Sequence, residues 1–161
     1  MFSHWQVLHV KPRCEKKVAE TCRAYNIPYY LPLRTEVKIY QRRRVTVEKP
    51  LFTGYLFAAV TRETQIHLTR TNKIIRFLTP LKPMSLLRDL VQLRRALRAD
   101  PALQSVPSLT KGQRVRIIAG PFRGVEGLVE RLSGTMRVVL TVDMIGMGVA
   151  VSADLRQVEP I

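Results

Sequence analysis

The sequence contains little cysteine, and this limits the ways in which the fold can be cross-linked. Cys14 and Cys22 are the only two cysteines in 161 residues. Their spacing is not a zinc-binding pattern, and on one helix they would lie about 12 Å apart along the axis, too far for a disulfide. We therefore expect neither a zinc site nor a disulfide, and a reducing compartment.

Long apolar runs and targeting signals are missing as well. No stretch approaches the roughly 20 consecutive apolar residues that span a bilayer. The first residues, Met1–Trp5, lack the charged start and the apolar run of a secretory signal peptide. The sequence therefore predicts a cytoplasmic protein with no membrane partner.

Patterns that carry catalysis are also absent. His4, His9 and His67 do not have the spacing of metal ligands. The chain has no phosphate-binding Walker loop, no Gly-x-Ser-x-Gly motif and no convincing carboxylate pair. We therefore expect a non-enzymatic protein that needs no metal or cofactor.

Negative charge is scarce, and the resulting positive charge is unevenly distributed. The chain has 27 Lys and Arg against 12 Asp and Glu, a net charge of +15. Residues 1–100 hold 20 basic and 7 acidic side chains (+13), whereas residues 101–161 hold 7 and 5 (+2). The basic part should attract polyanions, with nucleic acid as the first candidate. The near-neutral part indicates a second module with a different partner.

Hydrophobic periodicity predicts an α+β domain over residues 1–99. Strand-like and helix-like segments alternate in an order typical of a split βαβ, ferredoxin-like sandwich with helices on one sheet face. The predicted strands are Trp5–Val10, Ile27–Pro32, Leu51–Val60 and Ile74–Leu78, with a hairpin at Val37–Val47, and the predicted helices are Cys14–Tyr25, Gln65–Thr71 and Ser85–Ala99.

The predicted strand Leu51–Val60 places aromatic side chains on a sheet face without helices. Since side chains alternate along a strand, Tyr55 and Phe57 share one face, and Phe52 falls on the opposite face, towards the helices. The same alternation predicts that His9 lies on the face of Tyr55. We expect this face to be an interface, because aromatic side chains bury large areas with few rotatable bonds. The alternative, that the rings merely cover the sheet, remains open.

A change in composition predicts a linker and a second domain. Residues 100–109 are rich in proline, serine and glutamine, which is typical of a linker. Residues 110–161 contain short β-type runs between glycine-containing turns, the pattern of a small five-stranded SH3-like barrel. The predicted strands of this barrel include Val115–Ile118, Glu126–Arg131, Met136–Val142 and Val149–Val151.

Motifs in both modules resemble the NusG/RfaH family of transcription factors. Lys111–Ile117 followed by Gly120–Gly127 resembles the family's KOW motif, with Gly127 allowing close strand packing. In the first module, Trp5–Pro12 with Glu15, Tyr30–Leu33 and Pro50–Phe57 resemble the NGN domain. The two motifs cover nearly the whole chain. Residues 50–52 and the basic loop are more similar to specialised paralogues such as RfaH than to housekeeping NusG.

The resemblance implies a transcription elongation or antitermination factor, acting as a monomer. Its NGN domain would bind the clamp helices of RNA polymerase and approach non-template or upstream DNA. Its KOW domain would recruit a ribosomal small-subunit protein or Rho. By resemblance, the polymerase-binding residues are His9, Phe52, Tyr55 and Phe57; the nucleic-acid-binding residues are Lys11, Arg13, Lys16, Arg70 and Lys73; and the KOW partner-binding residues are Phe122, Val125, Met144 and Ile145.

Further residues and alternatives bear on these assignments. Arg42, Arg43 and Arg44 lie at the predicted hairpin tip, where they would contact upstream DNA or the polymerase, or form a solvated charged end. Phe52, Phe122 and Ile145 are alternatively core residues. A ribosome-associated KOW protein that binds structured RNA is the main rival, and it would place the positive charge on the KOW module. The strand-forming residues 138–142 favour a β-structured C-terminal domain over the helical hairpin of RfaH.

Overall fold

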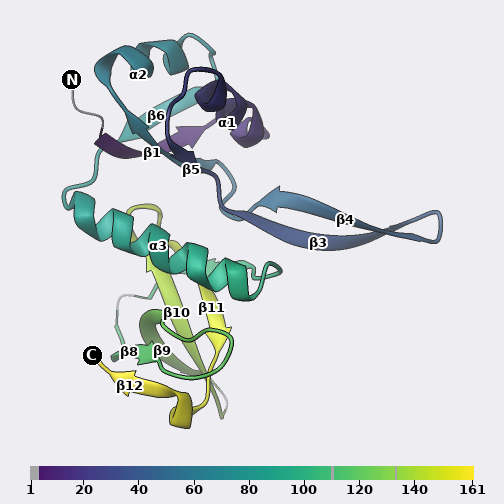
Figure 1. The fold of residues 1–161 in the computed structure, drawn as a ribbon, viewed down its shortest axis with the longest axis vertical. Helices are drawn as coiled ribbons and strands as arrows, with labels where there is room; N and C mark the ends of the chain where they lie inside the picture. Colours follow the sequence, from purple (N-terminus) through teal and green to yellow (C-terminus); the bar gives the residue numbers. More distant parts are fainter. Residues whose placement is uncertain (1–3, 110, 133) are drawn as a thin grey trace. The chain divides into compact units, whose positions relative to one another are not determined.

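The computed structural model describes residues 4–161 except 110 and 133, so the predicted first residue of the KOW module lies outside the described residues. The chain forms two compact units, Met1–Leu33 with Pro50–Met84 and Arg34–Lys49 with Ser85–Ile161. Both helices and sheets are present, and the predicted α+β class is confirmed (Figure 1). The division into 1–99, 100–109 and 110–161 stays a prediction.

The first unit is built on a four-stranded antiparallel sheet with the order β2-β5-β1-β6. Helix α1 (Glu15–Ala24) connects β1 to β2, and α2 (Arg62–Thr69) connects β5 to β6. β5 lies between β1 and β2, so β1-α1-β2 is a split βαβ unit. β1 lies between β5 and β6, so β5-α2-β6 is a second split unit, and the two units interleave. The strands are β1 (His4–Val10), β2 (Tyr29–Tyr30), β5 (Tyr55–Val60) and β6 (Ile74–Leu78).

The core of the first unit joins one sheet face to the two helices. In α1, Val18, Ala19 and Cys22 recur at helical spacing and are buried. They pack in one cluster with buried side chains of β1 and β5 and with Leu68 of α2. Burial raises the pKa of the Cys22 thiol to about 11. Cys22 and Cys14 are both free, as expected from their spacing.

Two predicted elements of this unit have different boundaries. Strand β5 begins at Tyr55 instead of Leu51, because residues 51–54 form a turn in which the Tyr55 N–H donates to the Phe52 carbonyl at 3.2 Å. Helix α2 begins at Arg62, three residues before the predicted start. Thr61 caps it, accepting the Thr64 N–H at 3.1 Å while the Thr64 hydroxyl accepts the Thr61 N–H at 2.8 Å.

The second unit includes a long hairpin made of β3 (Leu33–Tyr40) and β4 (Arg43–Pro50), which together form a two-stranded sheet. It extends beyond the predicted Val37–Val47. Gln41 and Arg42 form the connecting turn with φ values of 46° and 67°. Positive φ at both central residues is typical of the two-residue turns whose backbone twist matches the twist of the two flanking strands.

The remainder of the second unit is helix α3 (Pro83–Ala99) and a six-stranded antiparallel sheet of order β12-β8-β9-β10-β11-β7. Five strands were expected; β7 forms within the predicted linker and pairs with β11. Short 3-10 helices, η1 (Asp143–Ile145) and η2 (Leu155–Gln157), follow β10 and β11. The strands are β7 (Ser105–Pro107), β8 (Arg114–Ile117), β9 (Glu126–Leu132), β10 (Thr135–Val142), β11 (Met147–Ser152) and β12 (Val158–Pro160).

Two glycines of this C-terminal sheet lie against backbone of the neighbouring strand. A Cβ atom on Gly127 would lie 2.5 Å from the carbonyl oxygen of Val139, which confirms the predicted close packing at Gly127. A Cβ on Gly148 would overlap the carbonyl oxygen of Leu140. Neither position therefore accepts a side chain without displacement of the sheet backbone.

Candidate functional site

A stacked pair of rings marks one end of the sheet in the first unit. His9 of β1 and Tyr55 of β5 are directly paired, with ring centroids 4.8 Å apart and an interplanar angle of 15°. Both side chains are half-buried. Arg76 of β6 is the partner of His9 on its other side and is exposed. Because paired residues share a sheet face, two rings and a cation form a continuous row.

A buried carboxylate fixes the turn that precedes Tyr55. The Gly54 N–H donates to Glu15 Oε2 at 3.2 Å, and the Gly54 carbonyl accepts the Val10 N–H at 2.8 Å. Glu15 is only 4% exposed. Gly54 has a φ of 87°, a conformation that favours glycine. The start of α1 thus holds the chain next to both rings of the stack.

The two phenylalanines assigned to polymerase binding are buried. Phe57 lies on the same side of β5 as Tyr55, as alternation predicts, but it is fully buried between Val7 of β1 and Tyr30 of β2. The expectation that Phe57 is presented outwards with Tyr55 is therefore wrong. Phe52 is 2% exposed and belongs to the core, as the alternative interpretation had it.

Two loops that carry basic residues are joined by a backbone hydrogen bond beside β1 and β6. The Lys11 N–H donates to the Lys73 carbonyl at 2.9 Å, which joins the end of β1 to the start of β6. This hydrogen bond brings together the two segments that contain the predicted nucleic-acid-binding residues of the first unit. Lys73 is half-buried, and the exposed members of this group are Lys11, Arg13, Lys16 and Arg70.

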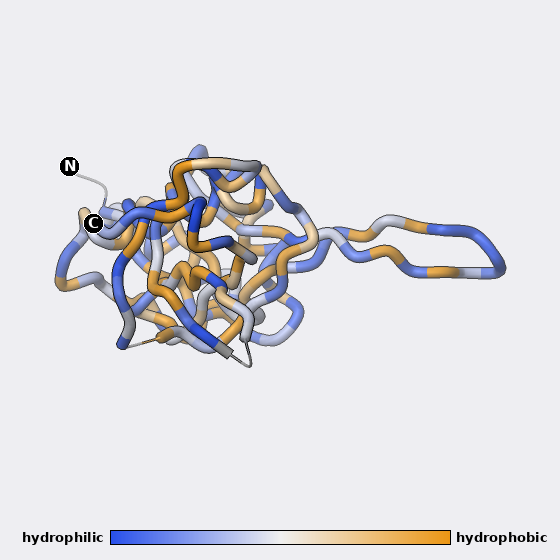
Figure 2. The backbone as a smooth tube through the Cα atoms, turned by 90° about the horizontal axis from the view of Figure 1, so that it is seen from below, coloured by the Kyte–Doolittle hydropathy of each residue, from blue (hydrophilic) through white to orange (hydrophobic). Residues whose placement is uncertain are grey.

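The three consecutive arginines lie at the end of the hairpin, as predicted. Arg42 is in the turn, Arg43 and Arg44 begin β4, and all three are exposed. Figure 2 shows the hydrophilic character of this tip. Further along the hairpin, Glu36 pairs with Lys49 at 2.9 Å, and this hydrogen bond lowers the pKa of the Glu36 carboxyl.

The four predicted partner-binding residues of the KOW module do not form one exposed patch. Val125 is fully buried, and it is fixed there because its N–H donates to Phe122 at 3.0 Å and its carbonyl accepts from Ile117 at 2.8 Å. The expectation of an exposed Val125 is therefore wrong. Phe122, Met144 and Ile145 are half-buried, so none of the three is a fully buried core residue.

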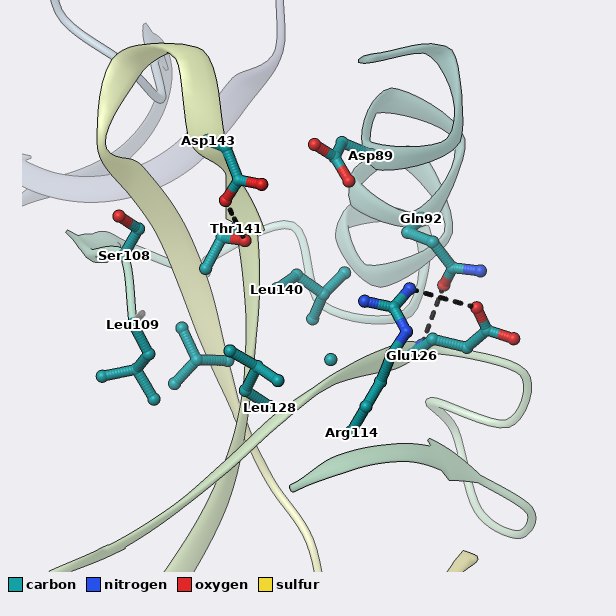
Figure 3. Close-up of a pocket in the computed structure, with 12 residues that line it drawn as sticks. Asp89, Gln92, Ser108, Leu109, Arg114, Glu126, Leu128, Leu140, Thr141 and Asp143 are labelled. Carbon is teal, nitrogen blue, oxygen red and sulfur yellow. Dashed lines mark hydrogen bonds and ion pairs between the residues drawn. The ribbon is translucent and has the colours of Figure 1, made fainter. Parts of the chain in front are cut away.

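A cavity of about 420 Å³ lies between α3 and the C-terminal sheet (Figure 3). Asp89 and Gln92 of α3 line one side, and Arg114, Thr141 and Asp143 line the other. Burial, followed by the nearby Asp143 charge, raises the pKa of Asp89 to about 6. This arrangement was not predictable from the sequence, because it depends on how α3 packs.

Within residues 4–109, 111–132 and 134–161, no group of three His, Cys, Asp or Glu side chains is placed to hold a metal ion. The helices in that same part of the chain are too short or too polar to cross a membrane.

Comparison with known proteins identifies the family. Residues 3–94 match the family model described as "Transcription termination factor nusG", which is more than half of the chain. The chain belongs to the NusG family. Members of this family are transcription termination and antitermination factors, so this NusG-family chain is a factor of that kind and not an enzyme.

Individual NusG proteins are similar over most of the chain. The termination/antitermination protein NusG of Lactococcus lactis subsp. lactis (strain IL1403) is 29% identical over 140 residues, covering 80% of this chain and 71% of that protein. A solved structure of Thermotoga maritima NusG, titled for its domain interaction, matches with a TM-score of 0.52 and 21% identity, covering 99% of this chain and 97% of that one. The second likeness concerns the fold alone.

Proposed function

We propose that this NusG-family chain binds RNA polymerase through its first unit and favours elongation over pausing or termination. In this proposal the first unit is a ferredoxin-like NGN domain, and the C-terminal sheet closes into an SH3-like KOW barrel that recruits a second partner. The observation that carries the proposal is the His9–Tyr55 stack, a partly open pair of rings at a sheet end.

The stack has the properties of an interface anchor. Its rings are already in contact, so little side-chain freedom remains to be lost on binding. The Glu15–Gly54 hydrogen bond fixes the turn next to them. Arg76 adds a cation at the same face, and arginine and tyrosine are both enriched at binding hot spots. A helical protrusion with apolar and acidic side chains, such as the polymerase clamp helices, would suit this row.

The action proposed for the factor requires no chemistry. A factor that binds the closed, elongating state of polymerase more tightly than the paused state shifts the population towards elongation. The KOW domain would bring its partner, a ribosomal small-subunit protein or Rho, to the polymerase at raised effective concentration. The charge of only +2 on residues 101–161 argues against direct binding of structured RNA by that domain.

A single-round elongation assay with purified polymerase tests this function. Adding the chain is expected to shorten pauses or raise read-through at a terminator, because the bound factor stabilises the elongating state. The Tyr55→Ala variant, added at the same concentration, is the control and should have a weaker effect. An unchanged distribution of transcripts with the correctly folded wild-type chain would contradict the proposal.

The basic hairpin tip supports contact with duplex DNA. Three exposed arginines would neutralise phosphates, which gives affinity and salt dependence without base recognition. Replacing Arg42, Arg43 and Arg44 together with alanine is expected to reduce the slope of log affinity against log salt by about 2 to 3. Fluorescence anisotropy with a labelled duplex over a range of salt concentrations measures this slope.

A charge-matched control distinguishes the contribution of the tip arginines from the general effect of a lower net charge. Arg94, Arg98 and Arg156 are exposed and lie outside the hairpin. Their triple alanine variant loses the same charge but leaves the hairpin tip intact. It should therefore keep most of the wild-type slope. Equal loss in the two variants would show that the tip has no special role in binding DNA.

A further inference from the structure

Two polar residues of α3 contact backbone groups of Gly124 and Glu126 in the C-terminal part of the unit. Gln92 Oε1 accepts the Glu126 N–H at 2.9 Å, and Arg95 Nη1 donates to the Gly124 carbonyl at 3.0 Å. One turn earlier, Asp89 lines the same cavity as Asp143. Figure 3 shows Asp89 and Gln92 turned towards the sheet.

The three side chains form a single row along the helix. Asp89, Gln92 and Arg95 are spaced three residues apart, which places them on one side of α3. This row runs beside the leucine stripe of α3, which is buried. The helix thus has an apolar stripe and, beside it, a polar row in which Gln92 and Arg95 meet the backbone groups of Glu126 and Gly124, and Asp89 faces the cavity that Asp143 also lines.

The contacted backbone groups border the candidate partner surface. Gly124 and Glu126 are the chain neighbours of the buried Val125. Asp143 is the first residue of η1, which contains Met144 and Ile145. A protein that bound at η1 and used these same backbone groups would have to compete with α3.

We propose that the backbone groups of Gly124 and Glu126 form a helix-docking site, that α3 is its resident occupant through Gln92 and Arg95, and that protonation of Asp89, which lines the same cavity as Asp143, strengthens this docking. The docking itself is independent of the proposed function. Its consequence for recruitment, that a partner at η1 competes with α3, rests on the proposed function.

The charges around Asp89 explain the link to protons. Asp143 faces it from the sheet, and Glu126 lines the same cavity but is paired with Arg116 at 2.8 Å. Arg114, from the sheet, and Arg88, from α3 itself, partly offset the like charge. The remaining effect is unfavourable for an ionised Asp89, since burial and Asp143 dominate.

The sign of the pH dependence follows from the raised pKa of Asp89. The docked helix binds a proton at this carboxyl more tightly than a free helix does, so docking is strongest below about pH 4, near the ordinary value of 3.8. Docking weakens as the pH rises towards about 6, the value in the docked state, and is constant above it. At neutral pH the Asp143 carboxylate repels the carboxylate of Asp89. This repulsion favours release of α3.

Amide hydrogen exchange on the full chain, followed by NMR, tests the docking. The Gln92→Ala variant is expected to reduce protection of the Glu126 amide about tenfold, because its acceptor is lost. The amide of Val129, bonded to Gln113 within the sheet at 3.0 Å, should not change and reports that the sheet is intact. Arg94→Ala, on an exposed position of α3, is the matched control and should leave the Glu126 amide as in wild type.

The Asp89→Asn variant tests the proton link, because its amide oxygen keeps an acceptor but carries no charge. In the wild type, protection of the Glu126 amide, corrected for intrinsic exchange, should fall about 25-fold from pH 4.5 to 7. In Asp89→Asn this fall should disappear, with protection at pH 7 close to the acid value. Unchanged Glu126 protection in Gln92→Ala would overturn the docking, and an unchanged pH dependence in Asp89→Asn would overturn the proton link. Neither result depends on polymerase, so both are separable from failure of the elongation assay.

Discussion

Replacing Tyr55 with alanine is expected to weaken the affinity of the chain for core RNA polymerase about 30-fold, or roughly 2 kcal/mol. The ring stacks on His9 and belongs to the row that continues to Arg76. Its loss removes both an anchor and the group that orients His9, so we expect faster dissociation more than slower association. Surface-based kinetics with immobilised core polymerase measures both rates.

The chain offers a closely matched control for this substitution. Tyr25 stacks on His67 with centroids 4.5 Å apart and an angle of 16°, in the same unit. Its side chain is 51% exposed. Tyr25→Ala removes the same ring from the same kind of pair, so any general effect of losing a tyrosine appears in both variants. Equal affinities for the two variants would remove Tyr55 from the polymerase interface.

Phe57 is unsuitable for the same test, although it was assigned to the same surface. Since its side chain is fully buried, Phe57→Ala would leave a cavity and cost about 3 to 5 kcal/mol of stability. Lost binding would then report unfolding. Tyr55 is half-buried at the beginning of its strand, so its ring can be removed with the centre of the sheet left intact.

Periodicity predicted the elements that bury one continuous side. The spacing of Val18 and Cys22 predicted α1, and the alternation from Tyr55 predicted β5 and its faces. Alternation decides which face a residue occupies, but it does not decide what covers that face. For this reason the side of Phe57 was predicted correctly and its exposure was not.

Elements that depend on distant partners were not predictable from local sequence. The turn before Tyr55 depends on Glu15, which is 39 residues from Gly54. Strand β7 has the composition of a linker and is a strand because β11 supplies its hydrogen bonds. Arg76 lies beside His9 because of strand register, and the polar row of α3 meets its partners because of how the helix packs. Such features are read from contacts, because no short window of sequence contains both partners.

Gly148→Ala is expected to cause a large loss of stability in the C-terminal sheet. Gly148 pairs with Thr141 of β10, and an added methyl group would overlap the carbonyl oxygen of Leu140. Because the obstacle is backbone in the centre of a sheet, relief requires separation of β10 from β11. We expect a cost of about 3 kcal/mol or more to the C-terminal sheet, measured by urea denaturation and by loss of its dispersed NMR signals.

Gly146→Ala is the control for this substitution, and the pair also tests whether the two units act separately. Gly146 has a φ of 66° but has nothing within 4 Å of an added Cβ, so alanine there should cost only about 1 kcal/mol. A similar loss of stability in the two variants would contradict the close packing at Gly148. Because the His9–Tyr55 stack belongs to the first unit, Gly148→Ala should retain affinity for core polymerase while it loses recruitment through the C-terminal sheet. Loss of polymerase binding in Gly148→Ala, but not in Gly146→Ala, would mean that the first unit needs a folded C-terminal sheet to present its rings.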